Sequence, residues 1–218
     1  MKLVLKHLVE LNLLNIQSVL NSMFKYCSSL VEISIPQSVT MIEKDAFAGC
    51  SSLNKIHIPS TLIEVEENAF SGIESLEILG DLQKIPKLMF KGCLSLIQIS
   101  IPSSVKLIDD ESFCGCCSLT RISISSSAVE IGKKAFDGVK SLEILGNLKA
   151  IPKSMFKDCS SLTHVNIVST VTSICEYAFY ECSSLTQFSI PPMVTSIESC
   201  VFYKCESLEE MDIPSSVS

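Results

Sequence analysis

The sequence lacks the features that mark several functional classes. No stretch approaches the roughly 18 uninterrupted apolar residues of a membrane-spanning helix, so no segment is expected to cross a bilayer. No run of lysine and arginine stands out and the formal net charge is −7, which argues against nucleic acid or an anionic membrane surface as a partner. Only 19% of the 218 residues are charged and 47% are apolar, a composition that can bury a large core and is not typical of a disordered chain.

Patterns of catalysis and metal binding are also missing. The chain has no Gly-x-Ser-x-Gly elbow, no phosphate-binding loop and no evident pairing of a nucleophile with a base. Of its three histidines, His57 and His164 are expected to lie roughly 20 Å apart in the repeat described below, too far to share a metal or a proton. The sequence therefore predicts a protein that is not an enzyme, with no cofactor and no metal.

What the sequence does contain is a repeat marked by phenylalanine. Nine of the ten phenylalanines form one series, in which the spacing is 23, 23 and 20 residues and then recurs. The series is Phe24, Phe47, Phe70, Phe90, Phe113, Phe136, Phe156, Phe179 and Phe202. The three intervals define a 66-residue super-repeat, and residues 75–80, which read SLEILG, recur letter for letter at residues 141–146. A fixed internal period of this kind is typical of stacked repeat architectures.

One full unit, residues 30–53, reads L-x-x-I-x-I-P-x-x-V-x-x-I-x-x-x-A-F-x-x-C-x-S-L. Its opening segment has the alternation of a short strand, and we expect the Ala-Phe segment to form a single helical turn. Each unit is too small to bury its own apolar side, whereas stacked units share a continuous core. The predicted fold is therefore an α/β solenoid of about nine coils of 20 or 23 residues, with a parallel sheet on its concave side and short helical turns on the other.

Cysteine forms a second series, at one position of seven coils. Its members are Cys27, Cys50, Cys93, Cys116, Cys159, Cys182 and Cys205. The two 20-residue coils carry Ile73 and Val139 at this position, so we expect these cysteines to be reduced and to serve as small buried apolar side chains. The cysteines outside the series are Cys114, Cys117, Cys175 and Cys200. We expect Cys114 and Cys117 to be exposed and to react first with a thiol reagent.

The positions beside the inward residues of each expected strand vary in charge and size, whereas the inward ones barely change. In stacked coils these outward positions form two columns on the concave face. The first column is Glu32, Lys55, Gln98, Arg121, His164, Gln187 and Glu210, and the second is Ser34, His57, Ser100, Ser123, Asn166, Ser189 and Asp212. We predict that this face binds a partner, with Lys55, His57, Arg121 and His164 as anchors. The alternative is a face that is merely solvated.

The unit of residues 30–53, with its L-x-x-I-x-I-P start and its A-F-x-x-C-x-S-L end, resembles the BspA-like leucine-rich repeat. The resemblance covers essentially the whole chain and implies a leucine-rich-repeat solenoid. That family is typical of surface antigens in mucosal bacteria and parasitic protists. The 20-residue coils depart from the pattern, because they lack Ile-Pro after the strand and carry Pro86 and Pro152 later.

The repeat also predicts the domain organisation. We expect a single solenoid over residues 1–218, a fragment cut through a longer array, with a partial coil at residues 1–23. The 66-residue super-repeats begin at residues 24, 90 and 156. Because uncapped coils expose strand edges and apolar core, we expect end-to-end self-association.

Two functions remain open at this point. The resemblance and the outward columns predict a protein-binding module, an adhesin-like piece of a surface antigen that binds a host or matrix protein and is displayed at the cell surface. The alternative is an intracellular interaction scaffold in the cytoplasm. It is favoured by the absence of a convincing signal peptide, by the cysteine series and by the lack of any Asn-x-Ser/Thr sequon.

Overall fold

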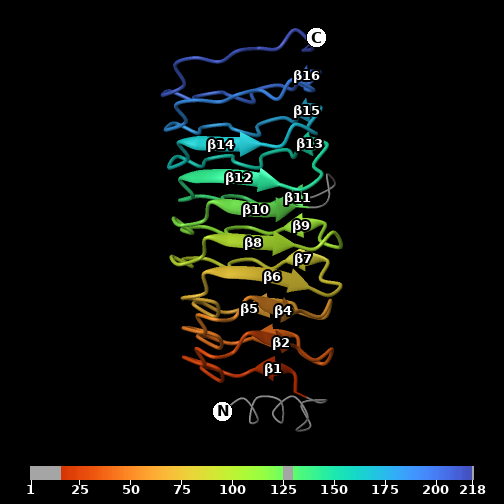
Figure 1. Cartoon of the computed structure of the whole chain (residues 1–218), viewed down its shortest axis with the longest axis vertical. Helices are drawn as coiled ribbons and strands as arrows, with labels where there is room; N and C mark the ends of the chain where they lie inside the picture. Colours follow the sequence, from red (N-terminus) through yellow and green to blue (C-terminus); the bar gives the residue numbers. More distant parts are fainter. Residues whose placement is uncertain (1–15, 125–129, 218) are drawn as a thin grey trace.

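A computed structural model describes residues 16–124 and 130–217. Their coils are stacked one above another along a single axis, from red at the N-terminal end to blue at the C-terminal end (Figure 1). Seven coils each contribute one strand to a seven-stranded parallel sheet, called the broad sheet below. Its strands are β2 (Glu32–Ser34), β4 (Lys55–His57), β6 (Ser75–Leu79), β8 (Gln98–Ile101), β10 (Arg121–Ile124), β12 (Ser141–Leu145) and β14 (His164–Ile167). Each strand pairs with those of the adjacent coils, so chain order and spatial order coincide.

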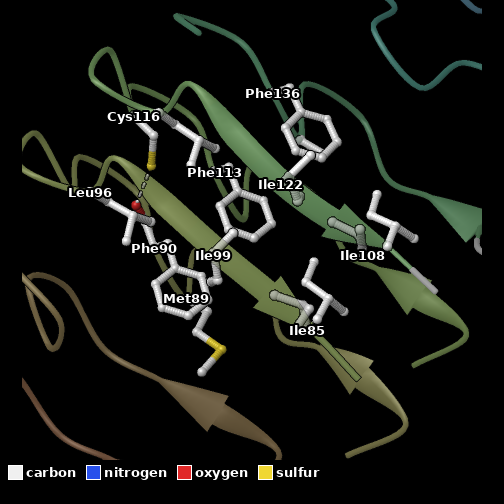
Figure 2. Close-up of a cluster of buried hydrophobic side chains, with 14 of the residues drawn as sticks. Ile85, Met89, Phe90, Leu96, Ile99, Ile108, Phe113, Cys116, Ile122 and Phe136 are labelled. Carbon is white, nitrogen blue, oxygen red and sulfur yellow. Dashed lines mark hydrogen bonds between the residues drawn. The ribbon is translucent and has the colours of Figure 1, made fainter. Parts of the chain in front are cut away.

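The core of the solenoid is a stack of phenylalanine rings. Successive rings of the series lie 5.2–5.6 Å apart between centroids. The seven inner rings are at most 1% exposed. Figure 2 shows Phe90, Phe113 and Phe136 in a row beside Ile99 and Ile122 of the broad sheet. These isoleucines point inward because successive side chains of a strand face opposite sides of the sheet.

The short helical turns expected at the Ala-Phe segments are wrong, since the described residues contain no helix. The residues two before and two after the phenylalanine have positive φ, as at Asp45 (57°) and Gly49 (73°), which no α-helix accommodates. Alternate N–H groups also donate to the next coil, Phe47 to the carbonyl of Ala69 at 2.8 Å and Gly49 to that of Ser71 at 2.7 Å. These segments therefore stack as hydrogen-bonded turns, named the turn ladder here.

The number of coils is also lower than expected. The described residues make about eight turns rather than nine coils, because the nine phenylalanines of the series bound only eight intervals. The solenoid with its parallel sheet is confirmed. The bounds of the domain and its super-repeats stay a prediction.

A second set of two-residue strands forms three narrow sheets. Their strands are β1 (Ser18–Val19), β3 (Met41–Ile42) and β5 (Glu64–Val65), then β7 (Lys84–Ile85), β9 (Leu107–Ile108) and β11 (Glu130–Ile131), then β13 (Ala150–Ile151), β15 (Ser173–Ile174) and β16 (Ser196–Ile197). The first break, between β5 and β7, and the second break, between β11 and β13, fall at the 20-residue coils. In other coils the residue after the narrow strand donates its N–H to the coil before, as Glu66 does to Ile42 at 2.9 Å. Pro86 and Pro152 stand at this position in the short coils and have no N–H to donate, so the narrow sheet ends there.

The short coils also shift the register of the broad sheet. Lys55 of β4 pairs with Glu77 of β6, and Glu77 pairs on its other side with Ser100 of β8, so the alignment steps by two residues across β6. Gly80 follows this shifted strand at φ 101°, and a Cβ there would stand 2.6 Å from the carbonyl oxygen of Ile58. The close approach of two backbones explains why the SLEILG segment ends in glycine.

Replacement of the second of these glycines tests the close approach. A Cβ at Gly146 would lie 2.3 Å from the carbonyl oxygen of Ile124. We expect Gly146→Ala to lower the free energy of unfolding by about 1–3 kcal/mol more than Gly92→Ala does, which is the usual cost of overpacking. Gly92 is the control, because it also has positive φ but no atom within 4 Å of a Cβ. Urea denaturation followed by circular dichroism measures both, and equal losses would contradict the assignment.

The cysteine series lies along the core. Cys50, Cys116 and Cys182 each donate the thiol to the carbonyl oxygen of a phenylalanine 26 residues earlier, at 3.0 Å. Burial raises the pKa of Cys50 to about 11 and that of Cys93 to about 12. These thiols therefore stay protonated near neutral pH, where the thiolate is the reactive form.

Outside the series, Cys117 and Cys200 are exposed. Cys114 was expected to be exposed as well, but it is partly buried, and this burial raises its pKa. We expect Cys117 and Cys200 to be alkylated before Cys114 and before the series, because their thiols are the most accessible. A time course of iodoacetamide labelling of the folded protein, resolved by mass spectrometry, measures the order. Labelling of the series as fast as Cys117 would show that the coils open freely.

Candidate binding face

The outward residues of the broad sheet and of its continuation lie on one face of the solenoid, called the broad-sheet face. In β2 the buried Ile33 stands between the exposed Glu32 and Ser34, and the same alternation recurs in the other strands. None of the fourteen residues predicted to face outward is buried. Their placement follows from the two-residue period of the strands.

The two predicted columns do not run straight along this face. The register pairs Gln98 with Arg121, as the first column predicts. At the short coil, however, the neighbour of Lys55 is Glu77, whose other neighbour is Ser100 of the second column. Across β6 the first column therefore lines up with the second column of the following coils. The same shift occurs across β12, where Glu143 lies between Arg121 and Asn166.

Two of the four expected anchors pair with glutamates of the 20-residue coils. Lys55 Nζ lies 3.5 Å from Glu77 Oε2, and Arg121 Nε lies 3.3 Å from Glu143 Oε2. The four side chains are 41–57% exposed, so each pair contributes only about 0–1 kcal/mol to stability. The two glutamates nevertheless neutralise the positive charges of Lys55 and Arg121, which the sequence predicts to be free to bind a partner.

Sequence reasoning missed Glu77 and Glu143, because the predicted columns passed over the 20-residue coils. The signal that could have found them is the recurrence of SLEILG, which places a glutamate beside a cation of the adjacent strand both times. The third anchor, His57, is also engaged, since its Nε2 lies 3.1 Å from Oε1 of Glu32.

The face is hollowed near its C-terminal end, in a depression of about 290 Å³. Six of the predicted residues line it, namely His164, Asn166, Gln187, Ser189, Glu210 and Asp212. Here the sheet thins to isolated parallel bridges, which join His164 to Gln187 and Gln187 to Glu210. Phe188 takes the inward position that isoleucine or valine fills in the preceding coils of the broad sheet, and its ring lies 4.7 Å from that of Phe179. The fourth anchor, His164, thus belongs to a cluster that the sequence did not distinguish from the rest of the face.

The hollow offers carboxylates, amides, a hydroxyl and an imidazole, which together can donate and accept many hydrogen bonds. Over residues 16–124 and 130–217, no three histidine, cysteine, aspartate or glutamate side chains lie close enough to hold a metal ion. In the same part of the chain, no helix has the length and apolarity that a membrane crossing requires. The arrangement suits recognition of a polar surface.

One broad-sheet strand from each of seven successive coils, a continuous parallel sheet and an apolar core shared between coils define a leucine-rich-repeat solenoid. A family model described as "BspA type Leucine rich repeat region (6 copies)" matches residues 17–143 and residues 131–218. The chain therefore belongs to the BspA-type leucine-rich-repeat family, as its repeat unit predicted. Leucine-rich repeats are in general protein-interaction modules, and the repeat is a binding fold rather than an enzymatic one.

Solved structures of leucine-rich-repeat proteins are similar to the chain. A leucine rich cell surface protein from Faecalibacterium prausnitzii is 28% identical with a TM-score of 0.46, over 90% of this chain and 57% of that one. The T. pallidum leucine rich repeat protein is 27% identical with a TM-score of 0.42, over 80% and 74%. A leucine-rich repeat protein from Bacteroides ovatus is 24% identical with a TM-score of 0.41, over 93% and 78%. No curated protein sequence matches the chain.

Proposed function

We propose that the chain is a protein-binding module that holds its partner on the broad-sheet face, as an adhesin-like part of a surface antigen. The observation that carries this proposal is the hollow near the C-terminal end of the face, where six polar side chains from three coils meet. Membership of the BspA-type family supports a protein as the partner. The resemblance of the repeat to surface antigens supports the adhesin-like role.

The hollow has the make-up of a binding surface. The six predicted residues line it with outward polar side chains, and Val165, Phe188 and Met211 stand at the inward positions between them. Polar side chains of this kind are typical of the rim of a protein interface. The stacked coils fix the backbone on which these side chains stand, so little conformational freedom is lost when a partner binds.

The charges of the broad-sheet face favour the hollow over the middle of the sheet as the place where a partner binds. Lys55 and Arg121 already pair with neighbouring glutamates, and a partner would have to compete with those pairs. Glu210 and Asp212 are exposed and form no ion pair with any described residue. A partner that contacts these two carboxylates displaces water and does not have to break an ion pair.

A pull-down with matched variants tests the proposal. The hollow variant is His164→Ala/Gln187→Ala/Glu210→Ala, and the control variant is His57→Ala/Gln98→Ala/Glu32→Ala, which removes the same residue types elsewhere on the face. Extracellular-matrix extract and cell lysate are the two sources, and mass spectrometry quantifies what each bait retains. We expect a matrix protein that wild type and control retain alike and that the hollow variant loses by at least about tenfold, since truncation of central interface residues costs more than 1 kcal/mol each.

The outcome also separates the two candidate functions. Equal recovery by all three baits would contradict the placement of the site in the hollow. A cytosolic protein lost only with the hollow variant would favour the second candidate, an intracellular interaction scaffold. The eleven free cysteines support that candidate, because disulfides are typical of secreted proteins.

End-to-end self-association is a further part of the proposal. Large apolar side chains are exposed in the first and last described coils, among them Tyr26 at 74% and Ile213 at 61%. Contact between such surfaces removes apolar area from water. We expect the sedimentation coefficient to rise with protein concentration and the double variant Tyr26→Ser/Ile213→Ser to weaken this rise. A sedimentation coefficient that does not change with concentration would contradict the expectation.

A further inference from the structure

The second break opens a hollow that is separate from the broad-sheet face. Lys133 and Lys134 from the coil before the break, and Ser154, Lys157 and Asp158 from the coil after it, line a space of about 360 Å³. The space lies where β11 and β13 do not pair. Polar side chains of two coils therefore meet at a point where neither narrow strand has a partner on that side.

The break also leaves a backbone donor without its usual acceptor. In six coils the N–H two residues before the series phenylalanine donates to the next coil, as Glu111 does to the carbonyl of Lys133 at 3.0 Å and Ser154 to that of Glu176 at 3.1 Å. The N–H of Lys134, at the same position, makes no such bond with any described residue. Lys134 is exposed, so this N–H is open to water and to an acceptor that enters the hollow.

The lysines of this hollow differ from most other lysines of the turn ladder, among which Lys87 is the one that also lacks an ion pair with a described residue. Five lysines elsewhere on the ladder pair with an acid of the adjacent coil, as Lys25–Asp45, Lys44–Glu67, Lys91–Glu111, Lys153–Glu176 and Lys204–Glu181. Lys133, Lys134 and Lys157 form no ion pair within the described part of the chain. Asp158 is the one carboxylate among the lining residues, so the hollow is positive within a protein whose net charge is −7.

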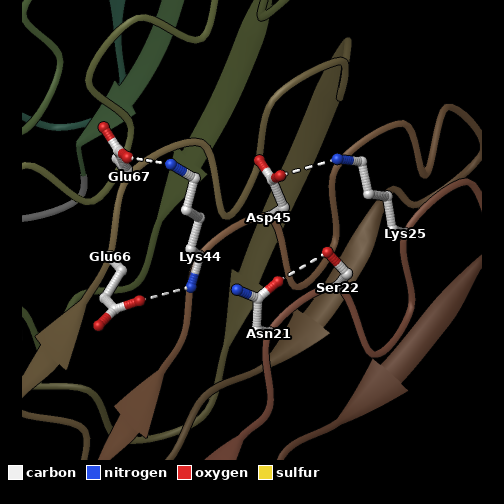
Figure 3. A network of polar contacts seen from close by, with 7 residues as sticks. All are labelled: Asn21, Ser22, Lys25, Lys44, Asp45, Glu66 and Glu67. Carbon is white, nitrogen blue, oxygen red and sulfur yellow. Dashed lines mark hydrogen bonds and ion pairs between the residues drawn. The ribbon is translucent and has the colours of Figure 1, made fainter.

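The first break, 66 residues earlier, gives an internal comparison. The positions of Lys133 and Lys134 are held there by Glu67 and Asn68. Figure 3 shows Glu67 paired with the ammonium group of Lys44. The same backbone interruption therefore carries a paired acid at the first break and lysines without an ion pair at the second. Of these lysines, Lys157 contacts aromatic rings, since its Nζ lies 5.1 Å from the ring centroid of Tyr180. The missing pairing of the narrow strands does not by itself make the hollow basic. The charge comes from residues that differ between the two super-repeats.

We propose that the second break binds a phosphate- or sulfate-type oxyanion group. Lys133, Lys134 and Lys157 supply the ammonium groups, Ser154 supplies its hydroxyl and Lys134 supplies its free backbone N–H. Hydrogen bonds from charged donors to an anion are stronger than neutral ones, and an oxyanion with three or four oxygens can accept from several converging donors at once.

A titration followed by ¹H–¹⁵N correlation spectroscopy tests this site on the whole chain. Inorganic phosphate and inorganic sulfate are the two probes, added separately at constant ionic strength. We expect saturable shifts of the Lys134 amide and its neighbours. The variant Lys133→Glu/Lys134→Asn gives the second break the residues of the first, and it should bind the better probe at least about tenfold more weakly, because it removes two charged donors.

The variant Lys25→Asn/Lys204→Glu is the matched control, since it changes the net charge equally at lysines that are already paired. We expect it to bind like wild type, and the circular dichroism of all three proteins shows whether each is folded. A preference for sulfate points to a sulfated glycan as the source of the group, and a preference for phosphate to a phosphorylated one. Unsaturable shifts with both probes, or equal weakening in both variants, would overturn the proposal.

Discussion

The contact between one coil and the next is the interaction on which the whole structure depends. No coil buries its own apolar side, and the seven inner phenylalanines become almost fully buried because rings above and below cover them. In the same stacking, N–H groups of the strands and turns donate to carbonyl groups of an adjacent coil. Ring contacts and hydrogen bonds therefore both join coils along the axis of the solenoid, and both require successive coils to have the same length.

The two 20-residue coils are where that period fails, and the irregularities of the ring stack, of the narrow sheets and of the strand register lie beside them. The rings of Phe70 and Phe90 are tilted by 39° and those of Phe136 and Phe156 by 48°, whereas the other neighbours in the series are within 21° of parallel. The narrow sheets stop at the same places, and the broad sheet changes register there. A change of three residues in length thus acts on the core, on both kinds of sheet and on the order of the surface side chains.

Most of the fold could be predicted because its signals are local and repeated, as the spacing of the phenylalanines is. The helical turns could not be excluded from sequence, because positive φ at Asp45 or Glu111 is imposed by bonds to the next coil and not by residue type. The layout of the broad-sheet face was predicted only in part. Alternation placed its side chains outward, but the diagonal course of the columns and the pairing of Lys55 with Glu77 depend on register, which appears only when the strands are assembled.

The two breaks divide the solenoid into stiff segments joined by compliant joints. At Phe70 and at Phe136 the backbone N–H makes none of the bonds to the next coil that six other phenylalanines of the series make. These two interfaces therefore have fewer backbone hydrogen bonds and depend more on ring contact and on the broad sheet. In a stacked array the resistance to bending is set by its weakest interfaces, because each coil touches only its neighbours. A molecule pulled or bent along its length would yield at intervals of one super-repeat, and the coils between the joints would move together as a block.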